Sequence, residues 1–348
     1  MKISIFFRES YLKNNCIFNP NIAGTSFWEI LRVKLLEYQI EIATHDVISE
    51  KEADLAIYVN LVTKPVKKSF LIAFESIAVL PKLQSLKYIN KFSKVFTYNN
   101  ILVDNIKVFT LYLSYDLFTP ESNLKFNKRK LILNISSNKY SSHKDELYSK
   151  RVEFIKFLEK NCKDEFSLYG SGWYTQFKFP HLYSFYKKFS LIKGFGLLNK
   201  ILLKTFSITG TGVFFYDKHD TYKGSVKNKL DVMRLYKFNI CFENIYGIDT
   251  YISEKIFDCF KAGVIPIYLG SSDVQIHIPK NTFIDYRDFS SLHDLYDFIY
   301  NMDENKFKLY LKNASKFIMS EKSLKFKNDY NVDILLNQIL KTLKIQKC

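Results

Sequence analysis

The chain has 348 residues, 47% of them hydrophobic and 17% aromatic, which is long and apolar enough to bury the cores of two α/β domains. Its formal net charge is +16, but the lysines are spread along the whole length without arginine-rich motifs, so we expect no nucleic acid as a partner. The five cysteines are odd in number and lack paired metal spacing, which is typical of a reduced cytoplasmic protein.

The N-terminal part of the chain alternates strands with a helix, which predicts a parallel sheet. A strand is expected at 2–7, and because Arg8 and Glu9 directly follow it, we expect no signal peptide. A capping box at 26–29, opened by Ser26, is expected to begin a helix that runs to about Tyr38. Four further strands complete a domain over residues 1–122, at 53–59, 70–74, 95–98 and 108–113.

One acidic residue of this domain, Glu75, directly follows an apolar strand. The carboxyl end of a strand in a parallel sheet faces the crevice where ligands bind, so Glu75 is a candidate for chemistry. By itself, an acid in this position is more often an ordinary solvated loop residue. The polar segment 119–129 then looks like a linker to a second domain, which we place at 123–325.

The second domain is expected to open with a strand at 131–137, followed by Ser137 and Asn138. Arg151 stands at the start of the next helix, where it would ordinarily be solvated. The segment 166–172 looks like a strand that ends in a glycine-rich turn, where the backbone could approach a ligand. Glycines alone are a weak signal for such a site.

A basic and aromatic segment follows. Between Glu165 and Asp217 there is no acidic residue, while six lysines lie among fifteen aromatic side chains. Cationic and aromatic residues together suit the headgroup boundary of a membrane. We therefore expect an anionic membrane surface as a further partner. No apolar run reaches the roughly 20 residues that span a bilayer, which predicts a protein peripheral to the inner membrane face.

The stretch 236–289 predicts a strand, a polar turn, a helix and a second strand. Ser253 is expected to cap the helix, and Gly263 is expected to end it. Such a unit builds a parallel sheet that binds ligands at the carboxyl ends of its strands. Four polar residues are expected at that edge, namely Asn244, Tyr251, Glu254 and Lys255.

These residues favour a nucleoside diphosphate as the ligand. Lys255, in the first turn of the helix, adds a full positive charge to backbone N–H groups that already attract anions. Glu254 and Asn244 could hold ribose hydroxyls. The alternative is an ordinary Glu–Lys pair on the surface of a helix.

The order of residues in this stretch resembles the donor-binding signature of glycosyltransferase family 10, the α-1,3/4-fucosyltransferases that use GDP-fucose, in its bacterial type. The resemblance lies in Tyr-Lys-Phe at 236–238, Phe-Glu-Asn at 242–244, Tyr-Ile-Ser-Glu-Lys at 251–255 and Ile-Pro-Ile-Tyr-Leu-Gly at 265–270. Ser253 replaces the usual threonine and keeps the hydroxyl. The resemblance implies an α/β protein of GT-B architecture, with two facing Rossmann-like domains and a deep inter-domain cleft.

The resemblance also implies roles for individual residues. Phe-Glu-Ser at 74–76 matches a family segment whose glutamate is the catalytic base, which makes Glu75 that base. Asn138 and Arg151 match a Ser-Asn pair and an arginine at the donor phosphates. The expected donor-binding set is Asn138, Arg151, Asn244, Tyr251, Glu254 and Lys255. No metal or other cofactor is expected, because the histidines are scattered and cations can neutralise the leaving diphosphate.

The implied function is that of an inverting, metal-independent hexosyltransferase. It would move L-fucose from GDP-fucose to a hydroxyl of a glycan acceptor, in α-1,3 linkage, for protein glycosylation or lipopolysaccharide or other bacterial surface polysaccharide biosynthesis. Two alternatives stay open. One is another GDP-deoxysugar donor, such as GDP-colitose or a GDP-6-deoxyheptose, and the other is a non-catalytic nucleotide-binding protein associated with the membrane.

Two segments receive no family role. The link at about 173–222 is longer than in the family, and it is either a membrane-docking or acceptor-binding insertion or a set of helices that pack on the catalytic domain. The tail, 326–348, is expected to form an amphipathic helix that packs against the domains.

Overall fold

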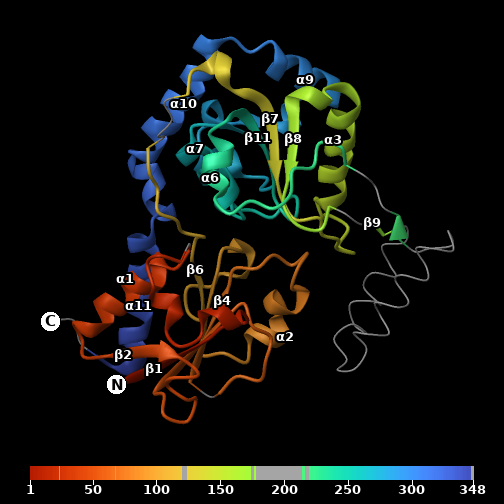
Figure 1. The fold of residues 1–348 in the computed structure, drawn as a ribbon. Helices are drawn as coiled ribbons and strands as arrows, with labels where there is room; N and C mark the ends of the chain where they lie inside the picture. The colour runs from red at the N-terminus through yellow and green to blue at the C-terminus, as the bar shows by residue number, and fades with distance from the viewer. Residues whose placement is uncertain are drawn as a thin grey trace.

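The computed structural model describes residues 1–22, 24–66, 68–119, 124–173, 176–177, 214–215 and 219–345. The chain forms two lobes, one above the other in Figure 1, and each is built on a parallel sheet with helices packed around it. This arrangement confirms the predicted α/β class.

The first lobe contains a six-stranded sheet in the order β2-β1-β3-β4-β5-β6, with every neighbouring pair parallel. Its strands are β1 (Lys2–Phe6), β2 (Glu41–Thr44), β3 (Leu55–Val59), β4 (Ser69–Ala73), β5 (Lys94–Thr97) and β6 (Val108–Thr110). Its helices are α1 (Ser26–Leu36) and α2 (Leu86–Ile89). Every residue of β3 and β4 is buried, as expected of central parallel strands covered on both faces. Of these strands, only β2 was not predicted.

The predicted capping box at the start of α1 is wrong. The N-cap residue is Thr25, and its side chain accepts no hydrogen bond from the helix. Its hydroxyl instead donates to the carbonyl oxygens of Asn19 and Ile22, at 2.6 and 2.7 Å. The Ser26 hydroxyl donates to Asp116 Oδ2 at 2.6 Å. The hydroxyls of Thr25 and Ser26 therefore connect the start of α1 by hydrogen bonds to the preceding loop and to Asp116.

The second lobe contains a five-stranded parallel sheet in the order β13-β12-β11-β7-β8. Its strands are β7 (Lys130–Ile135), β8 (Phe166–Tyr169), β11 (Tyr236–Phe242), β12 (Ile265–Leu269) and β13 (Ile284–Asp285). Its helices are α3 (Tyr148–Asn161), α6 (Lys229–Met233), α7 (Glu254–Ala262), α8 (Val274–His277), α9 (Leu292–Tyr300) and α10 (Glu304–Ile318). Gly263 ends α7 with a positive φ of 65°, as predicted.

The segment 173–222 is described only in part. Trp173 is buried, and its indole N–H donates to the carbonyl oxygen of Ser136 at 2.6 Å. Two short strands, β9 (Gln176–Phe177) and β10 (Phe214–Phe215), pair antiparallel. Residues 178–213, on which both interpretations of this segment depend, lie outside the described residues.

The predicted linker ends inside the second lobe. Arg129 is buried, and its guanidinium donates to the carbonyl oxygens of Tyr236, at 3.0 Å, and Gly263, at 2.9 Å. These bonds fix the chain at the start of β11 and the end of α7. Arg129, the last residue of the predicted linker, is therefore packed into the second lobe, where its side chain satisfies carbonyl groups that would otherwise be buried without partners.

The last helix returns to the first lobe. Figure 1 shows α11 (Asn328–Leu343) beside α1, close to both ends of the chain. Its apolar face belongs to the same buried cluster as β1, β3 and α1, through Val332, Leu335, Leu336, Ile339, Leu340 and Leu343. The predicted amphipathic tail helix is thus an integral part of the first core. Among the described helices, none is both long enough and apolar enough to cross a bilayer.

The lobes meet at the carboxyl ends of their sheets. The ring of Tyr98, which follows β5, lies 4.7 Å from that of Tyr251, which precedes α7. The Thr250 hydroxyl donates to the carbonyl oxygen of Tyr98, and the Ser141 hydroxyl donates to that of Ala78 at 2.6 Å. The loop after β4, which carries Glu75, therefore faces the second lobe.

Candidate functional site

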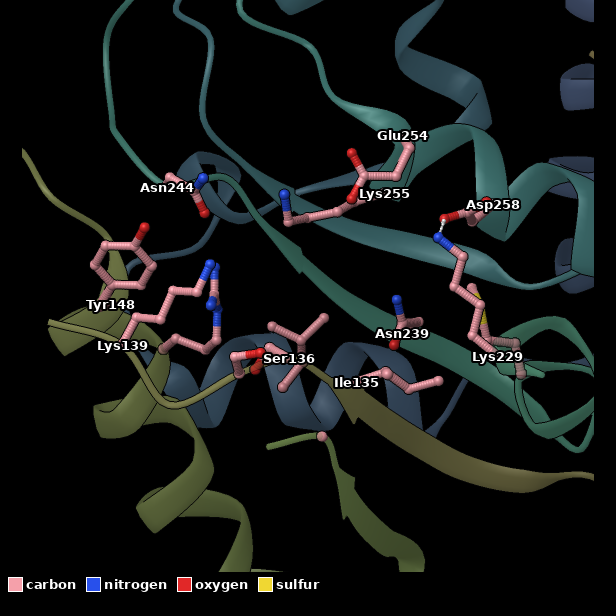
Figure 2. A pocket seen from close by; sticks show the side chains of 15 residues that line it. Ile135, Ser136, Lys139, Tyr148, Lys229, Asn239, Asn244, Glu254, Lys255 and Asp258 are labelled. Atoms are coloured by element: carbon pink, nitrogen blue, oxygen red, sulfur yellow. Dashed lines mark ion pairs between the residues drawn. The ribbon is translucent and has the colours of Figure 1, made fainter. Parts of the chain in front are cut away.

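A pocket of about 320 Å³ lies where β7 and β11 end and α7 begins. Figure 2 shows side chains from β7, β11, α6, α7 and the loops beside them around it. Six charged residues line the pocket, namely Lys139, Arg151, Lys229, Glu254, Lys255 and Asp258. Its described lining comes from the second lobe alone, at the strand edge where parallel sheets bind ligands.

Lys255 is held in place by a carboxylate that the solvent does not reach. Its Nζ lies 3.1 Å from Glu243 Oε2 and 2.9 Å from Ser253 Oγ. Glu243 also accepts hydrogen bonds from the amide and the hydroxyl of Ser253, at 2.7 and 2.6 Å. Burial alone would lower the pKa of Lys255, but Glu243 and Glu254 raise it above its ordinary value. Lys255 is therefore a fixed cation at the start of α7.

Ser253 occupies the predicted N-cap position of α7, but the predicted cap hydrogen bond is absent. Its hydroxyl instead donates to Glu243 Oε2 and accepts from Lys255 Nζ. The N-terminal amides of α7 are consequently left free of a side-chain cap from Ser253, which leaves them available to an anion.

Glu254 lies beside Lys255 at the same helix start. Burial would raise the pKa of its carboxyl, but the charges of Lys255 and Lys229 outweigh burial and hold that pKa below the ordinary value. Glu254 is therefore ionised at neutral pH, as a carboxylate that accepts ribose hydroxyls must be.

Arg151 lies in the first turn of α3 and lines the pocket. Its Nη2 donates to the carbonyl oxygens of Phe242, at 2.7 Å, and Glu243, at 3.2 Å, at the end of β11. Its guanidinium also lies over the ring of Tyr148, 5.5 Å from the centroid. Burial lowers the pKa of Arg151, but a guanidinium stays charged at any ordinary pH. Nη2 thus holds the Arg151 side chain in place, and the guanidinium contributes a positive charge to the pocket.

Two predicted residues lie outside the pocket lining. The Asn138 side chain donates to the carbonyl oxygen of Gly172 at 3.1 Å, and the lining comes from its neighbours Ser136, Ser137 and Lys139. Tyr251 is buried at the contact between the lobes, and its hydroxyl accepts a hydrogen bond from Asn244 at 3.3 Å. Asn244 itself does line the pocket.

The glycine-rich turn after β8 packs against the end of β7. Gly170 has φ of 125°, and a Cβ there would stand 1.9 Å from the carbonyl oxygen of Ser136. Only glycine therefore fits at this position. The turn supports the pocket-lining loop 136–139, and Gly170 itself is part of the lining.

Glu75 lies in the first lobe and is not part of the pocket lining. Among the described residues, its carboxylate accepts one hydrogen bond, from the Ser76 amide at 3.1 Å. Burial raises the pKa of Glu75, while Lys139 and Lys255 of the second lobe oppose that rise. Glu75 therefore lies within electrostatic reach of the pocket cations across the contact between the lobes.

Sequence reasoning missed several lining residues. Lys139 and Tyr148 follow β7, and Lys229, Asn239 and Asp258 lie further along the pocket. Asp258 could have been found, because it stands four residues after Glu254 and so on the same helix face. Within the described part of the chain, no group of three or more histidine, cysteine or acidic residues is placed to hold a metal ion.

Comparison with solved structures identifies the class of fold. A crystal structure of an α1,3-fucosyltransferase with GDP superposes with a TM-score of 0.55 and 18% identity, over 100% of this chain and 91% of that one. The Anabaena protein Alr3699/HepE, solved with UDP and glucose, superposes with a TM-score of 0.51 and 12% identity, over 99% of each chain. The chain has the GT-B architecture of glycosyltransferases, as predicted.

Sequence comparison links the C-terminal part of the chain to one family. Residues 198–334 match the family model for glycosyltransferase family 10 (fucosyltransferase), C-terminal domain. It is 35% identical over 99 residues to the α-(1,3)-fucosyltransferase FucT of Helicobacter pylori, and 38% identical over 87 residues to the mouse 4-galactosyl-N-acetylglucosaminide 3-α-L-fucosyltransferase 9. The aligned segments cover 28% and 24% of this chain, and 20% and 24% of those relatives.

Proposed function

We propose that the chain is an inverting fucosyltransferase that transfers L-fucose from GDP-fucose to a hydroxyl of a glycan acceptor. The observation that carries the proposal is the pocket at the start of α7, where Lys139, Arg151 and Lys255 gather positive charge beside the carboxylate of Glu254. This pairing suits a diphosphate attached to a ribose. The family match and the names of the fucosyltransferase relatives support the same interpretation.

In the proposed reaction, the acceptor oxygen attacks the anomeric carbon of fucose, and the bond from that carbon to the GDP oxygen breaks. Glu75 takes the proton of the acceptor hydroxyl as the new bond forms. The electron pair of the broken bond stays on the diphosphate, whose charge Arg151, Lys139 and Lys255 stabilise. Attack from the Glu75 side, opposite to the departing GDP, inverts the configuration at the anomeric carbon.

Three cations, of which Arg151 and Lys255 are anchored by hydrogen bonds, give the diphosphate the positive charge that a divalent metal supplies in other enzymes. We therefore propose transfer without a metal cofactor. The α-1,3 linkage and a bacterial surface polysaccharide or lipopolysaccharide acceptor are the further parts of the proposal, supported by the names of the relatives and the basic charge of the chain. A cytoplasmic position at an anionic membrane surface stays a prediction from that charge.

The test is turnover over a panel of donors. The purified chain is incubated with GDP-fucose, GDP-colitose, a GDP-6-deoxyheptose and UDP-glucose, with a set of glycan acceptors, with and without EDTA. Mass spectrometry identifies the product, and proton NMR identifies the anomer. We expect transfer from GDP-fucose with inverted configuration and a rate that EDTA leaves unchanged.

A Glu75→Gln variant separates catalysis from binding in the same assay. We expect a loss of transfer of about 10² to 10⁴-fold with GDP affinity unchanged, because the amide cannot accept the proton. An equal loss of GDP affinity would contradict the role of Glu75. GDP binding without turnover of any donor would instead favour the non-catalytic alternative.

A further inference from the structure

One end of the pocket has a polar group that the proposed mechanism does not use. Figure 2 shows Lys229 and Asp258 there, joined as an ion pair, with Lys139, Tyr148 and Asn244 at the opposite end. Lys229 Nζ lies 2.5 Å from Asp258 Oδ2. The pocket is therefore elongated, and its two ends differ in chemistry.

Asn239 lines the pocket between these ends with an acceptor that has no partner. The residue is 6% exposed, and its side-chain nitrogen donates to Cys241 Sγ at 3.3 Å and Cys259 Sγ at 3.4 Å. Its Oδ1 accepts no hydrogen bond from any described residue. A buried acceptor without a donor is costly, so a ligand N–H at this position would satisfy it.

Asp258 adds a carboxylate to this acceptor. Its side chain is 20% exposed, and its one ion-pair partner among the described residues is Lys229, which is 45% exposed. Burial raises the pKa of Asp258, and the Lys229 charge only partly opposes that rise. Both carboxylate oxygens keep lone pairs for further donors.

The same end of the pocket has apolar walls. Ile135 at the end of β7 and Met233 at the end of α6 both line it, and Met233 is buried. A polarizable methionine and a branched aliphatic side chain suit the faces of a flat aromatic ring. A ligand group that complements this end of the pocket therefore has apolar faces, two or more adjacent N–H donors for Asn239 and Asp258, and an acceptor for Lys229.

We propose that Asp258, Lys229 and Asn239 read the guanine base of the donor, an inference that rests on the proposed use of a GDP-sugar. Guanine presents N1–H and the N2 amino group side by side, with O6 next to them. Asp258 accepts from N1–H and from one N2 hydrogen, Lys229 donates to O6, and Asn239 Oδ1 accepts the other N2 hydrogen.

This assignment orders the whole donor along the pocket. The base lies at Asp258, the ribose at Glu254 and the diphosphate at Lys255, Arg151 and Lys139, with the sugar towards Glu75. Other bases fit the base site less well. Adenine and cytosine turn a ring nitrogen acceptor towards the Asp258 carboxylate, and uracil offers one ring N–H between two carbonyl oxygens, so each brings lone pairs against a negative charge.

The test measures nucleotide binding by calorimetry, without any sugar or acceptor. GDP, IDP, which lacks the N2 amino group, xanthosine diphosphate and UDP are titrated into the unmodified chain and into Asp258→Asn. We expect the unmodified chain to prefer GDP. In Asp258→Asn we expect GDP affinity to fall about tenfold or more. The variant should gain affinity for xanthosine diphosphate, because its amide N–H can donate to the O2 that replaces the amino group.

Two further variants distinguish the base from the phosphates. Lys255→Met should weaken all four nucleotides by a similar factor, because it removes a phosphate contact. Asp231→Asn, on the exposed side of α6, is the matched control and should bind GDP like the unmodified chain. Circular dichroism confirms that each variant is folded.

The outcomes separate this inference from the proposed function. A preference for GDP in the unmodified chain that survives unchanged in Asp258→Asn, with no gain for xanthosine diphosphate, overturns the base assignment alone. Absence of GDP binding by the unmodified chain overturns the proposed donor itself. Should Asp258→Asn fail to fold, Lys229→Met tests the contact with O6 instead, and a GDP affinity equal to that of the unmodified chain there overturns the assignment.

Discussion

The pKa of Glu75 depends on residues of both lobes. Glu75 belongs to the first lobe, yet Lys139 and Lys255 of the second lobe act on its pKa. Burial has the largest effect and raises that pKa. A general base works best when its pKa approaches the working pH, so this rise suits the proposed proton transfer.

The raised pKa predicts the pH dependence of transfer. Glu75 accepts a proton only as the carboxylate, so we expect kcat/KM to rise with pH through the pKa of Glu75 and then to level off. The midpoint should lie above 4.5, the ordinary value for a glutamate. Initial rates at saturating GDP-fucose and at acceptor concentrations well below KM, from pH 4 upwards, check this. A rate that stays flat down to that pH argues against Glu75 as the base.

The same shift predicts an effect on stability with a definite sign. A carboxyl whose pKa is raised by folding stabilises the fold below its unfolded pKa, and that contribution is lost as the pH rises through the folded pKa. Glu75→Gln does not ionise at any pH. The stability of the unmodified chain relative to this variant, measured by urea unfolding, should therefore decrease from pH 4 to pH 7.

At the scale of elements, the hydroxyls at two helix starts show what sequence pattern misses. Ser26 and Ser253 both stand where a cap is expected, yet each donates to a carboxylate, that of Asp116 and Glu243 respectively. The strands were easier to predict, because buried parallel strands are short continuous apolar runs. A cap depends on which acceptors lie nearby in space, and Asp116 is 90 residues from Ser26.

The site shows the same division. Arg151, Asn244, Glu254 and Lys255 were found because they stand in a signature with fixed order, and all four line the pocket. Lys229 was missed because its place depends on the packing of α6 against α7, which brings it to Asp258. The sequence also did not predict that the buried Glu243 positions Lys255. The three hydrogen bonds that Glu243 accepts, from Ser253 and Lys255, form only once the chain turns back after β11.

Gly270, at the end of β12, provides a prediction about the support of α7. A Cβ there would stand 2.4 Å from Glu243 Cγ and 2.7 Å from Tyr268 Oη. Gly270→Ala should therefore displace Glu243, lower the free energy of unfolding by about 1 to 3 kcal/mol and weaken GDP binding through Lys255. Urea unfolding and calorimetry check both effects.

Gly224→Ala is the control for this substitution. Gly224 has φ of 94°, and no atom lies within 4 Å of the position that a Cβ would take, so alanine there costs backbone strain without a clash. We expect it to lose roughly 1 kcal/mol of stability while GDP affinity stays the same. Normal GDP affinity in Gly270→Ala would mean that Glu243 does not position Lys255.

At the scale of the whole molecule, the last helix, α11, completes the core of the first lobe. Ile339 is fully buried in the core of the first lobe, so Ile339→Ala should lower the free energy of unfolding by about 2 to 5 kcal/mol. Tyr330→Ala, on the exposed side of the same helix, should cost less than about 1 kcal/mol. Hydrogen exchange should show the loss of protection in β1 and β3. Loss confined to β11 and β12 would contradict this placement of α11.

The place of α11 also has a consequence for how the protein is made. Ribosomal synthesis proceeds from the N-terminus, and a domain generally folds once its own residues have emerged. Here the helix that covers β1 and β3 emerges only after the whole second lobe. The apolar face of the first sheet therefore stays uncovered until α11 has been synthesised, whereas all residues of the second lobe emerge before α11. A nascent chain held before α11 should bind a holdase chaperone through its first lobe, and release of α11 should end that binding.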